Sequence, residues 1–404
     1  MDAIAKHILS TSQFDLPFLI KFMRTVEEIK KIAEAPGGEH LLLEVLRGKM
    51  VGRFFWPPSS RTFHQFSVAA QKLGAGGDSE RGLPKEIIDS EGKKKIVFEL
   101  PFSSEMKGAF FEDEIRAWAS AYYVLILRHH EEGYVTRAAS ILDSFQYDRH
   151  VINAGDGPGQ HPSQALIDLL TILYHFHINI EREWGRLKDM SIAFIGDNRM
   201  GRTVHSLAPL LGRLGFKIIF ISLPILTYPI DKLRELDESG TRYEFRETLC
   251  HADIFYVTRP NIGDYFPDEE ARIIDEYLKQ HAITQEVVMK YQPKLVLHPF
   301  PRRKEIPIWL PGDPATHHIS IDHMPQAGYF QQMDYGVLVR MALLKMVAAP
   351  YVDIGDLYAS RWNSTYTRQC ICGRVENSIL GWNECPQPPY LFLPKALNCS
   401  FCKT

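Results

Sequence analysis

The sequence predicts an α/β protein with two doubly wound, parallel-sheet domains and a small C-terminal segment of a different kind. Amphipathic helical patterns alternate with short apolar strand patterns over most of the 404 residues. Arginine and histidine residues directly follow several of these strands, where ligands bind in open α/β sheets. Five of the six cysteines lie beyond residue 369. The last observation sets the tail apart from the rest of the chain.

The first block of the chain, residues 1–164, alternates helix and strand patterns, which indicates a parallel sheet covered by helices. We expect helices over 16–35, 62–73 and 110–122. We expect strands over 48–56, 93–100, 123–128 and 150–155. Residues 75–95 are rich in glycine and charge, so they are expected to form a surface loop or a small insertion.

The second block, residues 165–335, repeats the alternation after a long helix from Pro162 to about His177. Pro162 suits the first turn of that helix. Strands are expected over 190–196, 217–223, 253–259 and 294–300. Helices are expected over 201–215, 229–240 and 270–282. A last helix, residues 336–351, is expected to complete the first domain, and residues 352–404 form the small segment.

Composition limits the classes of partner. The chain is 45% hydrophobic and 24% charged, as in an ordinary globular protein, and its net charge of −3 favours neither nucleic acid nor an anionic membrane as a partner. The longest apolar stretch, Lys217 to Ile230, contains two prolines and is too short to span a bilayer. The N-terminus lacks a secretion-signal pattern, so we expect a cytoplasmic enzyme.

The stretch RFFWPPSSRTF, residues 53–63, predicts an anion site. A buried strand precedes the two prolines, and a helical pattern follows them. Ser59, Ser60, Arg61 and Thr62 therefore lie at a helix N-terminus, where unpaired N–H groups and the helix dipole attract phosphate or carboxylate. The simpler interpretation is a serine N-cap beside a solvated arginine.

Arginines recur at the strand-to-helix connections. Arg61, Arg128, Arg202 and Arg259 hold such positions, which suggests a site for several anionic groups. His161 and Gln164 begin another helix, and HPFPRR follows a later strand. GDNRMGR does not match a dinucleotide fingerprint, because Asn198 stands where the second glycine belongs.

Six motifs stand in order along the chain: SSRT (59–62), LRHHEEG (127–133), NAGDGPGQHPSQALID (153–168), GDNRMGRTVHSL (196–207), HPFPR (298–302) and YFQQMDYGVLVRMALL (329–344). With them the sequence resembles the catalytic chain of aspartate carbamoyltransferases. The resemblance implies a carbamoyl-phosphate domain and an aspartate domain, in a homotrimer with shared active sites. It also implies N-carbamoyl-L-aspartate synthesis without a catalytic cofactor, an early step of de novo pyrimidine biosynthesis.

The resemblance assigns roles to individual residues. Ser59, Ser60, Arg61 and Thr62 match the phosphate-binding turn. The residues that match those holding the carbamoyl group are Arg128, His161 and Gln164. Those that match residues beside aspartate are Arg202, Arg259, Asn261 and the main chain of Phe300 and Pro301. SSEMKG resembles the loop that enters a neighbouring chain's site, with Ser103 and Lys107 as its functional residues.

Chemistry from the residues agrees with these roles. Carbamoyl transfer develops negative charge on a carbonyl oxygen, to which Thr62, Arg128 and His161 can donate. Arg61 and the helix N-terminus can stabilise the leaving phosphate. The resemblance adds Lys107 to the expected catalytic group. The sequence departs from the family at Ser60, Phe63, Met106, Asn261 and Phe300. The alternative is a carbamoyltransferase for ornithine, which would typically carry HCLP where this chain has HPFPR.

The cysteine-rich tail predicts a structural zinc site. Cys370 with Cys372, and Cys399 with Cys402, supply two close thiolate pairs. Cys385 is an alternative ligand because C-x-C is a tight spacing, and reduced cysteines in an unstructured tail are the competing interpretation. The segment also resembles the zinc module of the family's separate regulatory chain. That resemblance implies assembly beyond the trimer.

Overall fold

The computed structural model describes residues 6–88, 94–101, 108–259 and 268–357, together with 368–369 and 375–376. Its first sheet has four parallel strands in the order β2-β1-β5-β6. These strands are β2 (Ser79–Arg81), β1 (Val51–Phe55), β5 (Val124–His129) and β6 (His150–Asp156). The parallel arrangement brings the carboxyl ends of β1, β5 and β6 to one edge of the sheet.

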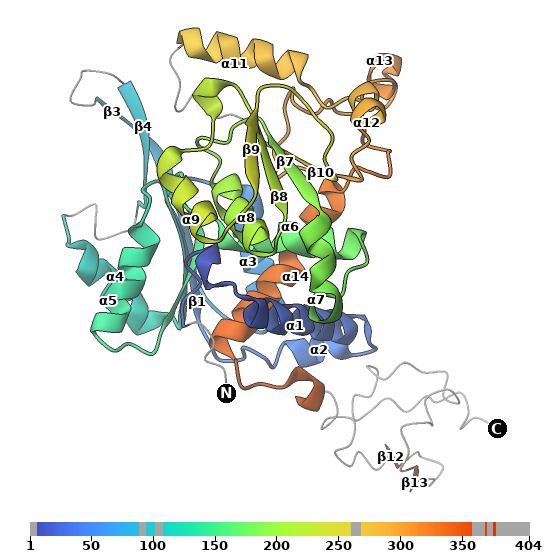
Figure 1. Cartoon of the computed structure of the whole chain (residues 1–404). Helices are drawn as coiled ribbons and strands as arrows, with labels where there is room; N and C mark the ends of the chain where they lie inside the picture. The colour runs from blue at the N-terminus through green and yellow to red at the C-terminus, as the bar shows by residue number, and fades with distance from the viewer. Residues whose placement is uncertain are drawn as a thin grey trace.

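Helices cover both faces of the first sheet (Figure 1). Val51 and Phe55 pack with α1 (Leu16–Glu34), α2 (Gly38–Leu42) and α3 (Ser60–Lys72). On the other face Phe54 joins a core formed with α4 (Phe111–Ala121) and α5 (Tyr134–Ser144). Because successive strand residues point to opposite faces, a strand covered on both faces is apolar almost throughout.

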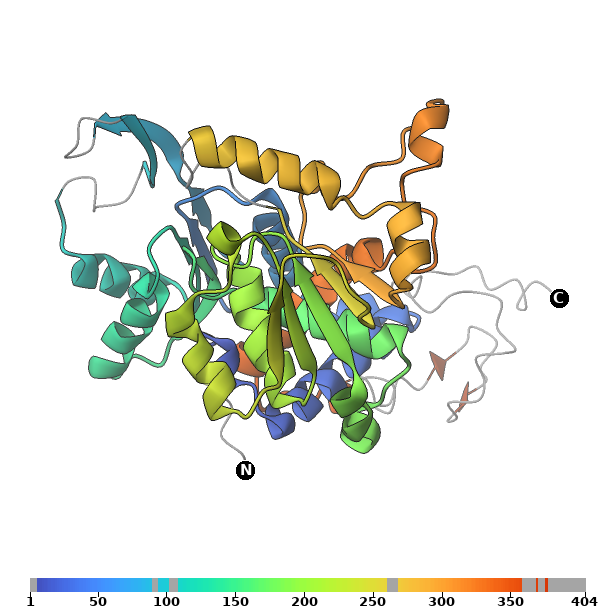
Figure 2. The same ribbon diagram turned by 45° about the horizontal axis from the view of Figure 1, so that its top comes forward.

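The second sheet has five parallel strands in the order β11-β10-β7-β8-β9. They are β11 (Leu295–Leu297), β10 (Ile254–Val257), β7 (Ser191–Ile195), β8 (Lys217–Ile221) and β9 (Tyr243–Arg246). The helices of this part of the chain are α7 (Ile180–Glu183), α8 (Arg202–Arg213), α9 (Leu233–Glu238), α11 (Asp268–Gln280), α12 (Gln285–Tyr291) and α13 (Pro314–His317). Figure 2 shows this sheet in front of the helices that connect it to the first.

Two helices join the sheets. These are α6 (Pro162–His175) and α14 (Tyr329–Ala348), which pack against each other, and α14 also packs on α1 and α3 (Figure 1). The end of the described globular part therefore lies against its beginning, and one core cluster includes residues from both sheets. Although α14 has 20 residues, neither it nor any other described helix is long and apolar enough to cross a membrane.

The structure corrects several sequence expectations. Residues 75–95, expected to be a surface loop or a small insertion, contain β2, β3 (Leu83–Ile88) and the start of β4 (Lys94–Glu99), which pairs with β3 as a hairpin. The expected strand over 93–100 is therefore antiparallel and lies outside the parallel sheet. Helices α5 and α12 and strand β9 were not expected, and α14 begins at Tyr329 rather than at residue 336. Strand β9 and helix α12 are short and little buried, so their periodic signals are weak. Helix α5 was overlooked although Tyr134, Ala138 and Leu142 give it a regular apolar face.

Candidate active site

A cavity of about 130 Å³ lies where the N-termini of α3, α6 and α8 converge with the turn after β11 and with α14. Its lining is polar and strongly basic. The residues that line it are Ser59, Arg61, Thr62, Gln65, Arg128, His161, Gln164, Ile167, Arg202, Thr203, His298, Pro299, Phe300, Gln332, Met333 and Arg340. Four of them are arginines, and among the described residues no aspartate or glutamate lines the cavity. Such a surface suits an anionic ligand.

The start of α3 forms one side of the cavity. Ser59 is the N-cap in an extended conformation, and its hydroxyl makes no capping hydrogen bond. Thr62 is buried, whereas Ser60 is exposed and does not line the cavity. Burial, together with the nearby charge of Arg259, lowers the pKa of Arg61 to about 10. Arg61 therefore stays charged at neutral pH but is held where a bound anion would stabilise it.

Two arginines converge on the glycine-rich end of β6 and the turn that follows it. Arg128 donates from Nη1 to the Ala154 carbonyl at 3.0 Å, and Arg202 donates from Nη1 to the Gly157 carbonyl at 3.2 Å. Gly155 lies between them with φ of 117°, and a Cβ there would come within 2.8 Å of the Arg128 guanidinium. Glycine is required both for the backbone conformation and for this close approach.

His161 precedes the first turn of α6 and is held in place through its own backbone. Its N–H donates to the Ser206 hydroxyl at 2.7 Å, and its Nε2 lies 3.5 Å from the Thr62 hydroxyl. Burial, followed by the charges of Arg128 and neighbouring arginines, lowers the pKa of His161 well below its usual value. The imidazole is therefore neutral at physiological pH and can donate one hydrogen bond to a ligand.

The turn after β11 is oriented by a buried histidine. The Phe300 N–H donates to His298 Nδ1 at 2.8 Å, so the proton of the neutral ring is on Nε2. Nε2 then donates to Glu305 at 2.9 Å. Although burial alone would raise the pKa of Glu305, hydrogen bonds from His298 and the Arg303 main chain hold it below its usual range. Phe300 itself adopts a positive φ of 53°.

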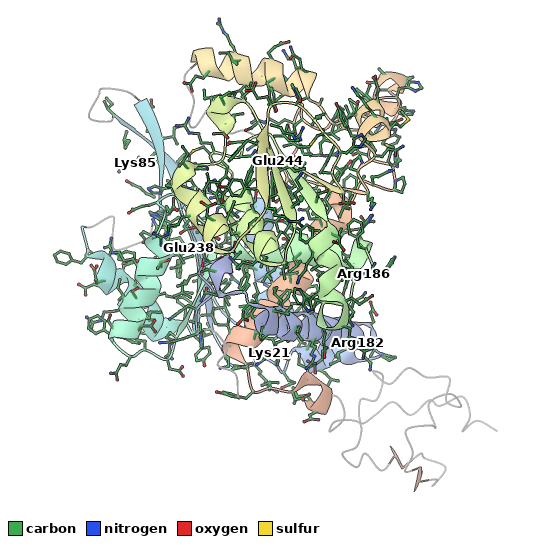
Figure 3. All side chains as sticks on the ribbon, in the orientation of Figure 1. Lys21, Lys85, Arg182, Arg186, Glu238 and Glu244 are labelled. Carbon is green, nitrogen blue, oxygen red and sulfur yellow. The ribbon has the colours of Figure 1, made fainter. Side chains whose placement is uncertain are left out.

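Sequence reasoning missed Arg340 in α14. This side chain is 1% exposed, whereas charged side chains such as Lys21 and Lys85 lie at the surface (Figure 3). Arg340 donates to Gln65 at 2.8 Å and to the Gly336 carbonyl at 2.9 Å. Burial, together with the charge of Arg61, lowers its pKa to about 9. An arginine inside the apolar run VLVRMALL is the signal that could have revealed it.

Two family profiles match most of the chain. The profile described as "Aspartate/ornithine carbamoyltransferase, carbamoyl-P binding domain" matches residues 6–174. The profile described as "Aspartate/ornithine carbamoyltransferase, Asp/Orn binding domain" matches residues 188–347. The chain belongs to the aspartate/ornithine carbamoyltransferase family.

Individual carbamoyltransferases support the assignment. The chain is 33% identical over 349 residues to the "Aspartate carbamoyltransferase catalytic subunit" of Methanothrix thermoacetophila, covering 85% of this chain and 98% of that one. For the subunit of the same description from Archaeoglobus fulgidus, identity is 34%, covering 85% and 99%. A solved Trypanosoma cruzi aspartate transcarbamoylase in complex with N-(phosphonacetyl)-L-aspartic acid has a TM-score of 0.66 at 28% identity, covering 84% and 95%.

In this carbamoyltransferase, eight of the residues predicted from the sequence line the cavity. They are Ser59, Arg61, Thr62, Arg128, His161, Gln164, Arg202 and Phe300. Arg259 follows β10 and lies close enough to Arg61 to lower its pKa, although it is not among the lining residues. Pro301 is exposed and, like Ser60, does not line the cavity.

The remaining predicted residues of this carbamoyltransferase lie outside the described part of the chain. These are Ser103, Lys107, Asn261, Cys370, Cys372, Cys385, Cys399 and Cys402. Within the described residues no group of three or more histidine, cysteine or acidic side chains could hold a metal ion. The zinc prediction therefore stays a prediction.

Proposed function

We propose that the chain transfers the carbamoyl group of carbamoyl phosphate to the amine of L-aspartate, giving N-carbamoyl-L-aspartate and phosphate. The observation that carries the proposal is the cavity, in which four arginines converge and no described acidic residue takes part. The two substrates together bring a phosphate and two carboxylates, which match this excess of positive charge. Relatives described as aspartate carbamoyltransferase catalytic subunits support the choice.

The phosphate is placed against the N-terminus of α3. Ser59 and Arg61 can bind its oxygens, and the N-terminal main chain of α3, which begins at Ser60, adds the attraction of the helix dipole. Thr62, Arg128 and neutral His161 can donate to the carbonyl oxygen of the carbamoyl group. The aspartate amine attacks the carbonyl carbon, the C–O bond to phosphate breaks, and the amine proton passes to the departing phosphate. Negative charge on the carbonyl oxygen is stabilised by donors already in place.

Aspartate is placed on the side of the second sheet. Arg202, at the start of α8, and Arg259, after β10, are proposed to bind its two carboxylates, with Asn261 beside them. The main chain of Phe300 and Pro301 is proposed to face the amine, on the turn that His298 orients. We retain the domain limits expected from the sequence, 1–164 with 336–351 and 165–335, as part of this proposal.

A homotrimer with shared sites is the proposed assembly, in which Ser103 and Lys107 reach a neighbouring chain's cavity. Purified Lys107→Ala and Arg259→Ala variants should each be nearly inactive. After dissociation and reassembly together, some sites should contain both intact groups and activity should return. Verified mixed trimers that regain no activity would contradict the shared site.

The C-terminal segment, 352–404, is proposed to bind one structural zinc through Cys370, Cys372, Cys399 and Cys402. In sequence, the first cysteine pair lies between the antiparallel strands β12 (Arg368–Gln369) and β13 (Val375–Glu376). Metal analysis should find about one zinc per chain. Removing it should shift the size-exclusion profile while the trimer keeps its activity. Metal-free protein with unchanged assembly would refute this. A cytoplasmic location also stays a prediction.

Steady-state assays with carbamoyl phosphate and either L-aspartate or L-ornithine test the proposed reaction. Aspartate should be strongly preferred because no described carboxylate lines the cavity to pair with an additional ammonium group. Turnover of ornithine equal to or faster than that of aspartate would overturn the assignment.

A further inference from the structure

A buried carboxylate behind the cavity holds three polar side chains. Asp168, on α6, is fully buried. Its Oδ1 accepts hydrogen bonds from Gln164 Nε2 at 2.8 Å and from Gln332 Nε2 at 2.6 Å. Its Oδ2 accepts from the Tyr256 hydroxyl at 2.9 Å. Asp168 therefore connects α6 with β10 and α14, and two of its three partners line the cavity.

These contacts determine which way both amides face. An ionised carboxylate can only accept hydrogen bonds, so each glutamine must turn its NH₂ group toward Asp168. For Gln332, the hydrogen bond at the other end of the amide independently confirms this orientation. Its Oε1 accepts from the His298 N–H at 2.9 Å, and a backbone N–H can only donate. Gln332 is thus fixed at both ends, by a carboxylate and by the main chain.

Gln164 is fixed at one end only. Its NH₂ group is used by Asp168, and the side chain lines the cavity, so the carbonyl oxygen is the end left for a ligand. A carbonyl oxygen accepts a hydrogen bond from an amine or amide N–H but offers nothing favourable to a methyl group. The orientation of this amide therefore bears on which acyl phosphate binds.

We infer that Asp168 is a positioning residue, which locks the Gln164 amide with its oxygen toward the cavity and so selects an acyl phosphate whose acyl group carries an N–H donor. The inference rests on the proposed function, and it identifies the group that selects carbamoyl phosphate as a substrate of that reaction. Asp168 itself does not contact the substrate in this account. It acts through Gln164, and the same oxygen also holds Gln332.

Burying the Asp168 carboxylate to hold the two glutamines is energetically costly, and a residue that served only to fill space would not carry that cost. Burial raises the pKa of Asp168 to about 7, against the hydrogen bonds from Gln164, Gln332 and Tyr256 and the charge of Arg340. The orientation of the amides does not depend on that ionisation. A proton on Oδ2 would be donated toward Tyr256, while Oδ1 would still accept from both glutamines.

Asp168→Leu tests the inference, with Asp168→Asn as the conservative variant. Leucine has the same branched arrangement of heavy atoms, although it is bulkier, and it accepts no hydrogen bond, which frees the Gln164 amide to turn. Asparagine can keep its oxygen toward both glutamines. Two quantities are measured in each protein: kcat/KM for carbamoyl phosphate and the inhibition constant of acetyl phosphate, which carries a methyl group in place of the NH₂.

In Asp168→Leu, the preference for carbamoyl over acetyl phosphate should fall by roughly tenfold or more, since a site built around a hydrogen bond discriminates strongly against an analogue without it. Asp168→Asn should keep the preference. Tyr256→Phe is the matched control, because it removes the third hydrogen bond to Asp168 and leaves both amides in place. A purely structural role would weaken both ligands equally in Asp168→Leu, and that result would overturn the inference.

The orientation can also be read without a variant. In a crystal structure with bound carbamoyl phosphate, at a resolution that separates nitrogen from oxygen, Gln164 Nε2 must face Asp168 and Oε1 must face the carbamoyl nitrogen. The reverse orientation would overturn the inference even if Asp168→Leu did not fold. An unaltered enzyme that transfers no carbamoyl group to aspartate would instead overturn the proposed function.

Discussion

The cavity wall differs in charge from the polar layer behind it, which consists of Asp168, Glu305 and the side chains that donate hydrogen bonds to them. On the wall, Arg61, Arg128, Arg202 and Arg340 converge with no described acidic residue among the lining groups. Behind it, the buried carboxylates of Asp168 and Glu305 each accept hydrogen bonds from several donors. Buried charge is costly unless it is compensated. The wall leaves that compensation to an anionic ligand, whereas behind it Asp168 is paired at both oxygens and Glu305 at Oε1.

The difference assigns separate tasks to the two regions. Arg61 and Arg340 have lowered pKa values because burial and repulsion from a neighbouring arginine, Arg259 for Arg61 and Arg61 for Arg340, disfavour their charge. A bound phosphate or carboxylate relieves that repulsion, so ligand binding and site stability are coupled. In the layer behind, His298 and Asp168 fix the directions of the groups that face the ligand. Removing a wall residue should therefore weaken ligand binding and catalysis directly. Removing a residue of the layer should instead disturb the orientation of the groups that face the ligand.

Arg61→Ala should have the largest effect. It removes the charged donor at the N-terminus of α3, and kcat/KM for carbamoyl phosphate should fall by about 10²–10³-fold. Arg24→Ala is the matched control, because Arg24 pairs with Glu181 at the exposed surface and should leave the kinetics unchanged. If Arg61→Ala kept activity within a few-fold of the unaltered enzyme, the wall would not be the phosphate site.

Glu305→Ala tests the layer behind the wall. It leaves the His298 Nε2–H buried without its acceptor, which should cost about 1–3 kcal/mol of unfolding free energy. Urea denaturation measures that loss. Because His298 also orients the Phe300 turn, kcat should fall by roughly tenfold, since small displacements of positioned groups are costly. Unchanged kcat in a destabilised variant would separate Glu305 from the active-site geometry.

Gly336→Ala should reduce kcat/KM by a smaller factor, and it should fail to give the gain in stability that alanine normally brings to a helix. An alanine normally stabilises a helix interior by about 1 kcal/mol relative to glycine. Here the added Cβ would lie 2.3 Å from the Gln65 amide, which holds Arg340. We expect a several-fold loss of kcat/KM and no gain in thermal stability. Gly185→Ala, where a Cβ meets nothing within 4 Å, is the control. A stabilised, fully active Gly336→Ala would contradict the contact.

The clearest effect of His129 should be on the pH dependence of the unfolding free energy. Burial, assisted by the charge of His130, lowers its pKa from 6.5 to about 3. The unfolded chain therefore binds a proton below pH 6.5 that the folded chain does not, and unfolding free energy falls on acidification. Between pH 6.5 and 3 this contribution is at most about 1.4 kcal/mol per pH unit. His129→Gln should show a shallower slope in urea denaturation at pH 5 and 7. An unchanged slope would mean that His129 is not held neutral.

The sequence was most informative where chemistry coincides with a regular pattern. Arg61, Arg128 and Arg202 could be predicted because each directly follows or begins a strongly periodic element. Arg340 and Asp168 were missed because both lie inside long helices, where packing brings Arg340 into the cavity wall and Asp168 behind it. The one signal for Arg340 was its place in an apolar run. Strand β3, and with it the antiparallel pairing of the expected strand β4, was missed for the opposite reason. Its residues are largely exposed, so they show little of the alternation that burial imposes.

Titration calorimetry of the unaltered protein with N-(phosphonacetyl)-L-aspartate tests most directly whether one basic wall holds a phosphate group and two carboxylates at once. Because linking the anionic groups in one molecule avoids ordering two separate ligands, it should bind at least roughly 10³-fold more tightly than inorganic phosphate. Arg61→Ala should remove most of that advantage, and Arg24→Ala should keep it. Affinity no better than that of phosphate, or unaffected by Arg61→Ala, would contradict the account.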